Sequence, residues 1–315
     1  MDTLSSIAEE IHDPDEESFF IFSSPIPTSN LGFIDSHAPF LDISIHDNDY
    51  SIIQSQGLLS SKREGGTTGA VLWKITPLLS TWLSSASNPL RTNFLSPSSA
   101  VVELGCGISS LLALSLGPLV GKYIATDQEY VKRLFRENLL GNLSTAYKNP
   151  NKKGKAQRKG KTGSSSPSPS PSPSRAAARA TESSSEIKAE NIAFTQLDWE
   201  LNDALALNEC VDDRNGFDML VSCDCIYNEA LAAPFVRTCA DICRLRSRSA
   251  EREGRPTVCV IAQQLRMPDV FETWLREAMK EFRVWRVFDE VLGDDLKLGT
   301  GYVVHLLMLK EESMR

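Results

Sequence analysis

The chain has 315 residues, of which 41% are hydrophobic, and a formal net charge of −8 at pH 7. Its acidic start lacks a basic apolar leader and no apolar run reaches membrane-spanning length, so we expect neither a secreted nor a membrane protein. Seven cysteines, an odd number mostly in apolar segments, are typical of reduced, buried thiols. We therefore expect a soluble, cytoplasmic protein with a sizeable core.

Residues 1–40 are polar, acidic and dotted with proline, so we expect them to be mostly disordered. Alternating apolar and polar side chains in 41–55 predict a hairpin, and the helical spacing of apolar residues in 67–82 predicts a helix. We expect residues 41–99 to hold these two elements and to open a single domain that spans 41–315.

From residue 100 onward, short apolar runs alternate with amphipathic helical patterns, as in a parallel sheet covered on both faces. The last two runs follow one another without a helix, which predicts an antiparallel C-terminal hairpin at one edge of the sheet. The expected fold is α/β, a Rossmann-like, seven-stranded doubly wound sheet. The predicted strands are 100–104, 123–127, 192–199, 217–223, 258–262, 284–291 and 302–309.

One segment, 148–187, breaks this alternation with a basic run and then Ser-Pro repeats. It has almost nothing large and apolar to bury, so it predicts a disordered insertion within the domain. Strand and helix patterns resume beyond it, and long surface insertions cost little closure entropy. A solvated loop is the favoured interpretation of the basic run; contact with RNA and a nuclear-import signal are the alternatives.

The first strand of the alternating region ends in Glu103, and Gly105, Cys106 and Gly107 follow it. Glycine has no Cβ, so such a turn lets a ligand approach the backbone and aims the next helix at it. A nucleotide-like cofactor fits, although glycine turns also serve only to pack a helix on a strand. A dinucleotide needs a third glycine, where Ser110 stands, so S-adenosylmethionine is the favoured cofactor.

Three acids end predicted strands, where ligands bind in doubly wound sheets. Asp127 can accept hydrogen bonds from ribose hydroxyls; a plain helix N-cap is the alternative. Asp198 can accept from an adenine amino group while Trp199 covers the ring, unless that indole is simply part of the core. Asp224 and Tyr227, just past the fourth strand, stand where the reacting group is expected.

Together these motifs resemble the seven-strand, class I protein-lysine methyltransferases of the methyltransferase-like 21 group. The matching stretches are Thr68–Trp73, Glu103–Gly107, Asp127, Leu197–Trp199 and Asp224–Glu229. The resemblance implies S-adenosylmethionine as the cofactor and a basic protein substrate, a large-subunit ribosomal protein.

The resemblance also implies the roles of individual residues. It places Asp224 and Tyr227 against the substrate lysine. Our hypothesis is that Asp224 accepts a hydrogen bond from the ammonium group and that Tyr227 confines it through a cation–π contact. The residues expected to line the cofactor site are Trp73, Glu103, Gly105, Cys106, Gly107, Asp127, Asp198, Trp199 and Cys223.

Other functions stay open at this point. A methyltransferase of the same fold that acts on a nucleic-acid base or a small molecule is one, although Asp224 to Tyr227 lacks the prolines of base methylases. A binding module without turnover is another. We expect no metal: zinc bound by Cys223, Cys225, Cys239 and Cys243 is disfavoured by their spacing. We expect a monomer.

Overall fold

The structure is a computed structural model that describes residues 2–27, 32–63, 66–147, 189–211, 216–247 and 255–314. The insertion expected at 148–187 lies outside the described residues. Within them, no helix is long and apolar enough to cross a membrane.

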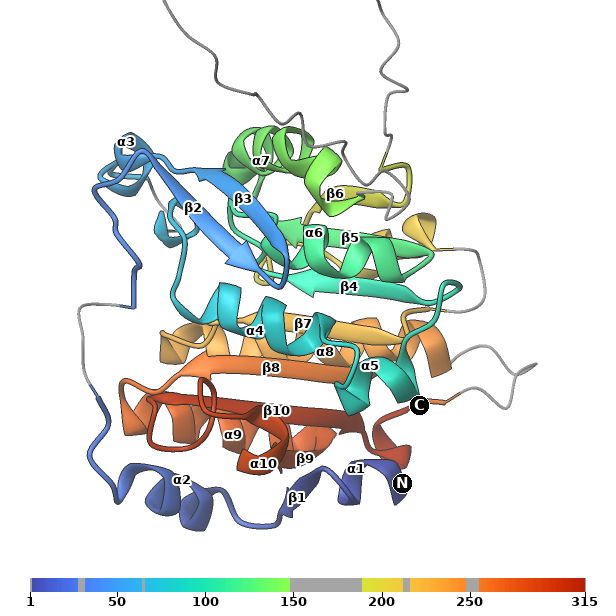
Figure 1. Ribbon diagram of the computed structural model, residues 1–315. Coiled ribbons are helices and arrows are strands. Elements are labelled where there is room, and N and C mark those ends of the chain that lie inside the picture. Colours follow the sequence, from blue (N-terminus) through green and yellow to red (C-terminus); the bar gives the residue numbers. More distant parts are fainter. Residues whose placement is uncertain are drawn as a thin grey trace, which may run out of the picture.

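A single mixed sheet forms the centre of the molecule (Figure 1). Five strands are parallel, and the chain winds outward in both directions from the junction of β4 and β7, which confirms the doubly wound topology. In sheet order the strands are β1 (Ala8–Ile11), β9 (Phe282–Val287), β10 (Tyr302–Leu309), β8 (Val258–Gln264), β7 (Met219–Cys223), β4 (Ala100–Leu104), β5 (Lys122–Asp127) and β6 (Ile192–Gln196).

The C-terminal strands are antiparallel as expected, since β10 pairs with both β8 and β9 in that sense. The expectation that no helix separates the last two strands is wrong, because β9 ends at Val287 and α10 (Asp289–Leu292) follows it. The strand count differs, because β1 pairs antiparallel with β9 and makes the sheet eight-stranded in the described residues. The hairpin therefore does not form the edge of the sheet.

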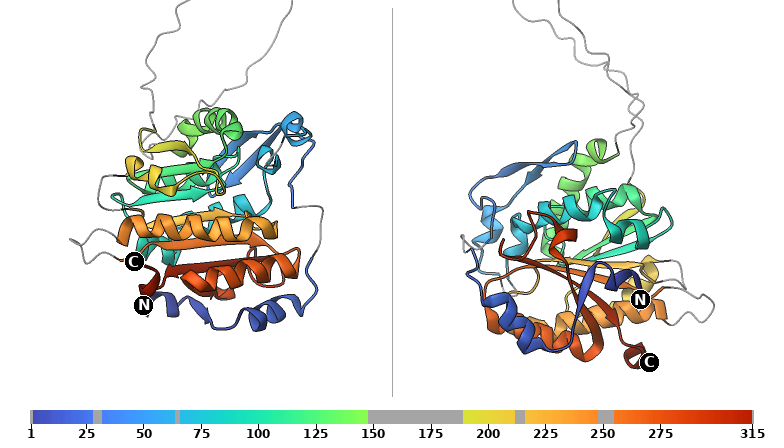
Figure 2. Two further views of the ribbon diagram at one scale, coloured as in Figure 1. Left: turned by 180° about the vertical axis from the view of Figure 1, so that it is seen from behind. Right: turned by 60° about the horizontal axis from the view of Figure 1, so that its bottom comes forward.

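Helices cover both faces of the sheet (Figures 1 and 2). One face carries α4 (Ile75–Ser84), α5 (Pro89–Phe94), α6 (Leu111–Leu116), α7 (Lys132–Ala146) and α10 (Asp289–Leu292), and the other carries α8 (Glu229–Ser247) and α9 (Pro268–Glu281). The short 3-10 helices are η1 (Thr68–Ala70), η2 (Gly117–Leu119), η3 (Glu129–Val131), η4 (Ala204–Cys210) and η5 (Glu311–Met314).

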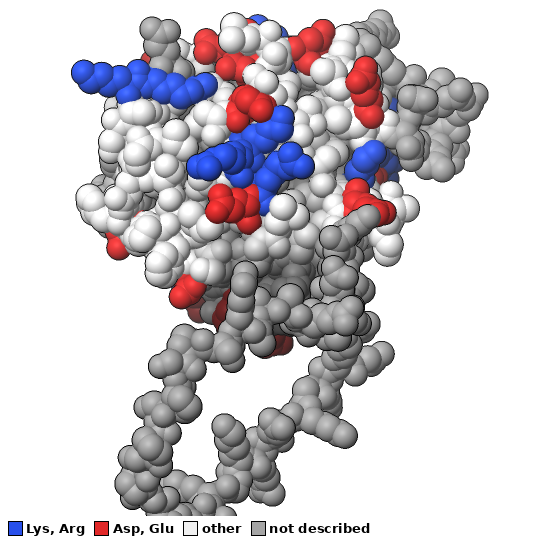
Figure 3. All heavy atoms as spheres, turned by 90° about the horizontal axis from the view of Figure 1, so that it is seen from above, with Lys and Arg blue, Asp and Glu red and all other residues white. Residues whose placement is uncertain are grey.

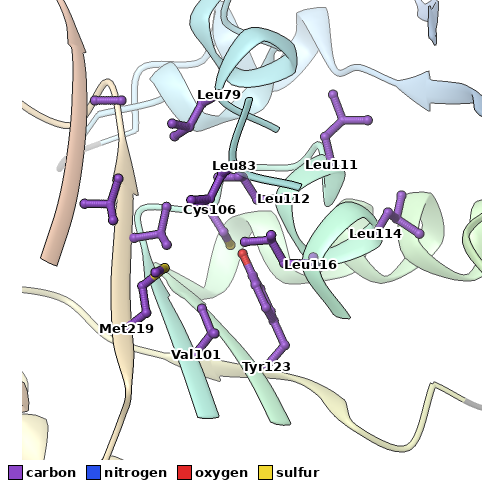
Figure 4. Packing of buried hydrophobic residues seen from close by; sticks show 14 of the residues in the cluster. Leu79, Leu83, Val101, Cys106, Leu111, Leu112, Leu114, Leu116, Tyr123 and Met219 are labelled. Carbon is purple, nitrogen blue, oxygen red and sulfur yellow. The ribbon is translucent and has the colours of Figure 1, made fainter. Parts of the chain in front are cut away.

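The core lies between the sheet and these helices. On the α4 and α6 face, leucines meet the fully buried side chains of β4, β5 and β7, here Val101, Tyr123 and Met219 (Figure 4). Every residue of β8 is buried, as expected of a strand covered on both faces. This burial fixes the sheet, and thereby fixes where the strands end.

The hairpin of β2 (Phe40–Ile45) and β3 (Asn48–Ile53) forms a separate two-stranded sheet, followed by α3 (Gln56–Leu59). Two asparagines of α7 hold it in place. Asn138 bonds the N–H and C=O of Ile53 at 2.8 and 2.9 Å, and Asn142 bonds those of Ser51 at 3.0 and 2.9 Å. Because each amide matches a backbone donor and acceptor, α7 satisfies one edge of the hairpin.

The expectation that residues 1–40 are mostly disordered is wrong. This stretch forms α1 (Asp2–Ser5), β1 and α2 (Pro14–Phe22). Asp13 caps α2 by accepting the N–H groups of Asp15 and Glu16 at 2.8 and 3.1 Å. The segment also buries Ile11 and Ile21. Its acidic composition suggested a solvated tail because the matching positive charges lie about 270 residues away in sequence, on β9.

Arginines of β9 bind these acids. Arg283 contacts Glu10 at 2.6 Å, and Arg286 contacts both Glu9 and the buried Glu17. Burial works to raise the pKa of Glu17, but its contact with His305 and the charge of Arg286 outweigh burial and lower that pKa. These ion pairs hold the N-terminal segment on the edge of the sheet.

We expect Arg286→Ala to lower the free energy of unfolding by about 3 kcal/mol, because it leaves the buried Glu17 carboxylate with only its contact to His305. Arg276→Ala is the matched control: its pair with Asp15 is exposed and should contribute less than about 1 kcal/mol. Urea unfolding followed by circular dichroism measures both variants. Equal losses would contradict a specific role for the buried pair.

Candidate active site

A cavity of about 350 Å³ opens at the carboxyl ends of β4, β5 and β7, where the winding direction reverses. All the residues expected at the site line it. They are Trp73, Glu103, Gly105, Cys106, Gly107, Asp127, Asp198, Trp199, Cys223, Asp224 and Tyr227. The structure thus brings together side chains from across 155 positions of sequence, as the rule for strand ends predicts.

The glycine turn after β4 is attached to β5. The N–H groups of Gly105 and Cys106 both donate to the carbonyl of Thr126, at 2.9 and 3.1 Å. Gly105 has a φ of +70°, and a Cβ at that position would lie 2.3 Å from the Cys225 sulfur and 3.3 Å from the Trp199 ring. Only glycine fits there, which leaves bare backbone on the cavity wall.

Asp127 holds the same turn from the end of β5. Its carboxylate accepts the N–H of Gly107 at 2.8 Å and of Gln128 at 2.7 Å. Burial nevertheless raises the pKa of Asp127 to about 6, against the effect of those two hydrogen bonds. Each carboxylate oxygen keeps a further lone pair, so the residue can still accept ribose hydroxyls.

Glu103 lies deeper, only 3% exposed, and accepts a hydrogen bond of 2.7 Å from the Tyr123 hydroxyl. Burial raises the pKa of Glu103 to about 8, opposed by the Tyr123 hydrogen bond and reinforced by the Asp127 charge. The side chain is therefore mostly protonated at neutral pH, and can donate as well as accept.

Asp198 and Trp199 form one end of the cavity. Asp198 accepts from the Gln128 amide at 3.0 Å and from the N–H of Glu200 at 3.0 Å. The Trp199 ring packs edge-on against Phe235, with the ring centroids 5.1 Å apart. Trp199 thus both packs against Phe235 and forms part of the cavity wall, and its covering of an adenine ring stays a prediction.

Trp73 and Tyr227 line another part of the cavity wall. The Trp73 indole donates to the Thr68 carbonyl at 3.0 Å and packs against Phe33, with centroids 4.6 Å apart. Tyr227 is 39% exposed, and burial of the remainder raises the pKa of its hydroxyl. An aromatic ring that is partly open to solvent suits a channel through which a side chain enters.

Asp224 is already bound by another side chain. Its carboxylate, 1% exposed, accepts two hydrogen bonds from the Arg266 guanidinium, at 2.6 and 2.8 Å, and a third from the N–H of Gln264 at 3.2 Å. Its φ of +58° is rare for a residue other than glycine and places strain at the end of β7. If Asp224 accepts a hydrogen bond from a substrate lysine, it does so while it is paired with Arg266.

Three thiols, those of Cys106, Cys223 and Cys225, also line the cavity. Burial raises the pKa of each of them, so they are protonated and poor nucleophiles. In the described residues no group of three His, Cys, Asp or Glu side chains is placed to hold a metal ion. Two other thiols, those of Cys243 and Cys259, lie in the core with their sulfurs 3.5 Å apart.

Sequence reasoning missed Arg266, Gln128 and Tyr130. Gln128 follows Asp127 directly and Tyr130 comes two residues later; both line the cavity, and the Tyr130 hydroxyl accepts the N–H of Gly69 at 3.1 Å. Arg266 follows the carboxyl end of β8. The rule that ligands bind beyond the carboxyl ends of strands, which predicted the three acids, could therefore have predicted Arg266 as well.

The sheet order and the cavity at its switch point define a class I methyltransferase fold. No family model matches the sequence. The chain is 31% identical over 252 residues to the ribosomal lysine N-methyltransferase 5 of Zygosaccharomyces rouxii, covering 75% of this chain and 72% of that protein. A protein of the same name from Vanderwaltozyma polyspora is 28% identical, covering 88% and 95%.

A further match, 35% identical over 126 residues, is to a Schizosaccharomyces pombe protein named diaminohydroxyphosphoribosylamino-pyrimidine deaminase. It covers 40% of this chain but only 30% of that protein. The longer matches show that the chain belongs to the ribosomal lysine N-methyltransferase 5 family. It is accordingly an S-adenosylmethionine-dependent protein-lysine methyltransferase.

The Glu103 environment predicts a pH dependence of stability. The folded pKa lies near 8, above the ordinary 4.5, so the folded protein binds the proton more tightly than the unfolded chain does. This contribution to the free energy of unfolding falls by about 1.4 kcal/mol per pH unit between these values. Glu103→Gln, which cannot ionise, should therefore gain stability relative to wild type from pH 5 to pH 8 in urea unfolding. A constant difference between the two proteins would contradict the raised pKa.

Proposed function

We propose that this enzyme methylates a lysine side chain of a large-subunit ribosomal protein. The proposal is carried by the 31% identity to a protein named ribosomal lysine N-methyltransferase 5, over 72% of that protein. It is supported by the single cavity, which is lined by every residue expected to contact the cofactor or the substrate lysine. A net charge of −8 also suits a basic protein partner.

The reaction asks little of the protein beyond positioning. S-adenosylmethionine supplies an already activated methyl group, so the enzyme must bring a neutral amine in line with it. The bare backbone at Gly105, the carboxylates of Asp127 and Asp198 and the Trp199 ring suit the adenosyl part. Tyr227 and Asp224 then suit the lysine, with Tyr227 at the partly exposed entrance.

A basic stripe of the kind that tracks nucleic acid is not seen over α7. Figure 3 shows this face from above, and its described part carries Lys and Arg side chains interspersed with Asp and Glu. Such mixed charge favours contact with a protein more than with a phosphate backbone. The proposal places the substrate lysine on a protein because the relatives are named lysine N-methyltransferases, and RNA methylation is an outcome that the test can report.

The test incubates the purified enzyme with tritiated S-adenosylmethionine and large ribosomal subunits from Saccharomyces cerevisiae that lacks its own ribosomal lysine N-methyltransferase 5. We expect label in one basic protein, released as methyllysine on acid hydrolysis. Label in ribosomal RNA would support a base methyltransferase instead. Absence of label from every subunit component would overturn the ribosomal substrate.

Tyr227 provides the matched variants. If its ring confines the lysine, Tyr227→Ala should lower kcat/KM at least about tenfold, whereas Tyr227→Phe, which keeps the ring, should stay within about threefold of wild type. Calorimetry with S-adenosylhomocysteine should show unchanged cofactor affinity in both. Equal losses in the two variants would assign the effect to the hydroxyl and reject confinement by the ring.

A further inference from the structure

Arg266 lies beside Asp224 but does not line the cavity itself; it lines a smaller pocket together with Tyr227 and Gln264. Two of its nitrogens contact the two Asp224 oxygens, and its guanidinium also bonds the Gln264 side chain at 3.1 Å. The guanidinium carbon lies 5.1 Å from the centre of the Trp73 ring. The Arg266 side chain is only 22% exposed and that of Asp224 only 1%, so the ion pair is largely shielded from solvent.

The N-terminal segment closes over this pair. Gly32 has a φ of +82°, and a Cβ added there would lie 2.0 Å from the Gln264 oxygen and 2.8 Å from an Arg266 nitrogen. The backbone therefore reaches the guanidinium more closely than any other residue would allow. Such packing fixes the orientation of the fork, which a bidentate pair requires.

Hydrogen-bond capacity limits what Asp224 can offer a substrate. A carboxylate has about four lone-pair positions, and three of them accept from Arg266 and Gln264. One position on the oxygen that carries a single contact is left. Asp224 can thus accept one N–H of an amine, but its negative charge is already matched.

The charge balance matters because a lysine must lose its proton before it can accept a methyl group. Its ordinary pKa is about 10.4, and an unmatched carboxylate would favour the charged ammonium form further. We propose that Arg266 keeps the lysine end of the site electrically neutral by pairing with Asp224, so that the substrate enters and is held as the neutral amine. This inference rests on the proposed lysine substrate.

Other titratable groups do not replace Arg266 in this balance. Tyr302 of β10, Tyr227 and Cys223 face the same region, and burial raises the pKa of each, so they are uncharged near neutral pH. Lys74, before α4, is half-buried, and Glu229, at the start of α8, is exposed. Asp127 and Glu103 lie at the ends of β5 and β4, next to the glycine turn.

The experiment is a charge series read as pH profiles of kcat and KM with the ribosomal subunits described above. Arg266→Gln leaves Asp224 unmatched, and should shift the acidic limb of kcat upward by at least about one pH unit. At pH 7 its kcat should fall at least tenfold while KM does not rise. The loss should shrink as the pH increases.

The other variants separate charge from structure. Asp224→Asn leaves Arg266 unmatched and should place the limb at or below that of wild type. The double variant Asp224→Asn and Arg266→Gln restores neutrality and should return the limb to within about half a unit of wild type, even if kcat is low. Arg266→Lys keeps the charge and should do the same. Arg276→Gln, an exposed arginine of α9, serves as the unaffected control.

The same fractional loss at every pH in all variants would overturn the proposal and leave Arg266 a purely structural residue. Binding of n-butylamine, followed by saturation-transfer NMR, gives a readout that needs no turnover. Wild type should bind it near pH 10 and not at pH 7, whereas Arg266→Gln should bind it at both. If that pattern holds but no ribosomal protein is labelled, the charge balance stands and only the substrate assignment fails. Equal binding by both proteins at pH 7 would reject the balance itself.

Discussion

The attachment of the glycine turn to β5 is the constraint on which the site depends. Three successive N–H groups bind β5: those of Gly105 and Cys106 donate to the Thr126 carbonyl, and that of Gly107 donates to the Asp127 carboxylate. The turn cannot move without breaking bonds to the neighbouring strand. Because β4 and β5 are themselves fixed by burial, their ends are held as rigidly as the core.

Five carboxyl side chains line the cavity, and for three of them, Glu103, Asp127 and Asp224, the structure shows a different way of accommodating the charge. Glu103 sits deepest, and burial keeps it mostly protonated near neutral pH. Asp127 accepts hydrogen bonds from two backbone N–H groups, and burial raises its pKa only to about 6. Asp224 is matched by a full positive charge on Arg266. Three negative charges in one cavity would repel one another and would be costly to bury. Protonation of Glu103, hydrogen bonding of Asp127 and pairing of Asp224 each lower that cost.

Much of this arrangement could be predicted from the sequence. The alternation of apolar runs and helical patterns predicted the doubly wound sheet, and the rule for strand ends gathered Asp127, Asp198 and Asp224 into one site before any coordinates. Arg266 obeys the same rule, but a lone arginine in a loop belongs to no sequence pattern that would predict its role. Its importance follows from a distance of 2.6 Å to Asp224, which only three-dimensional structure reveals.

The N-terminal segment shows most clearly where composition misleads. Acidic, proline-containing sequence predicts disorder only when the charges lack partners, and here Glu9, Glu10 and Glu17 find theirs on β9. The same segment goes on to place Phe33 against Trp73, where the two backbones form an isolated antiparallel bridge. One stretch of chain therefore both extends the sheet and packs against the aromatic wall of the site.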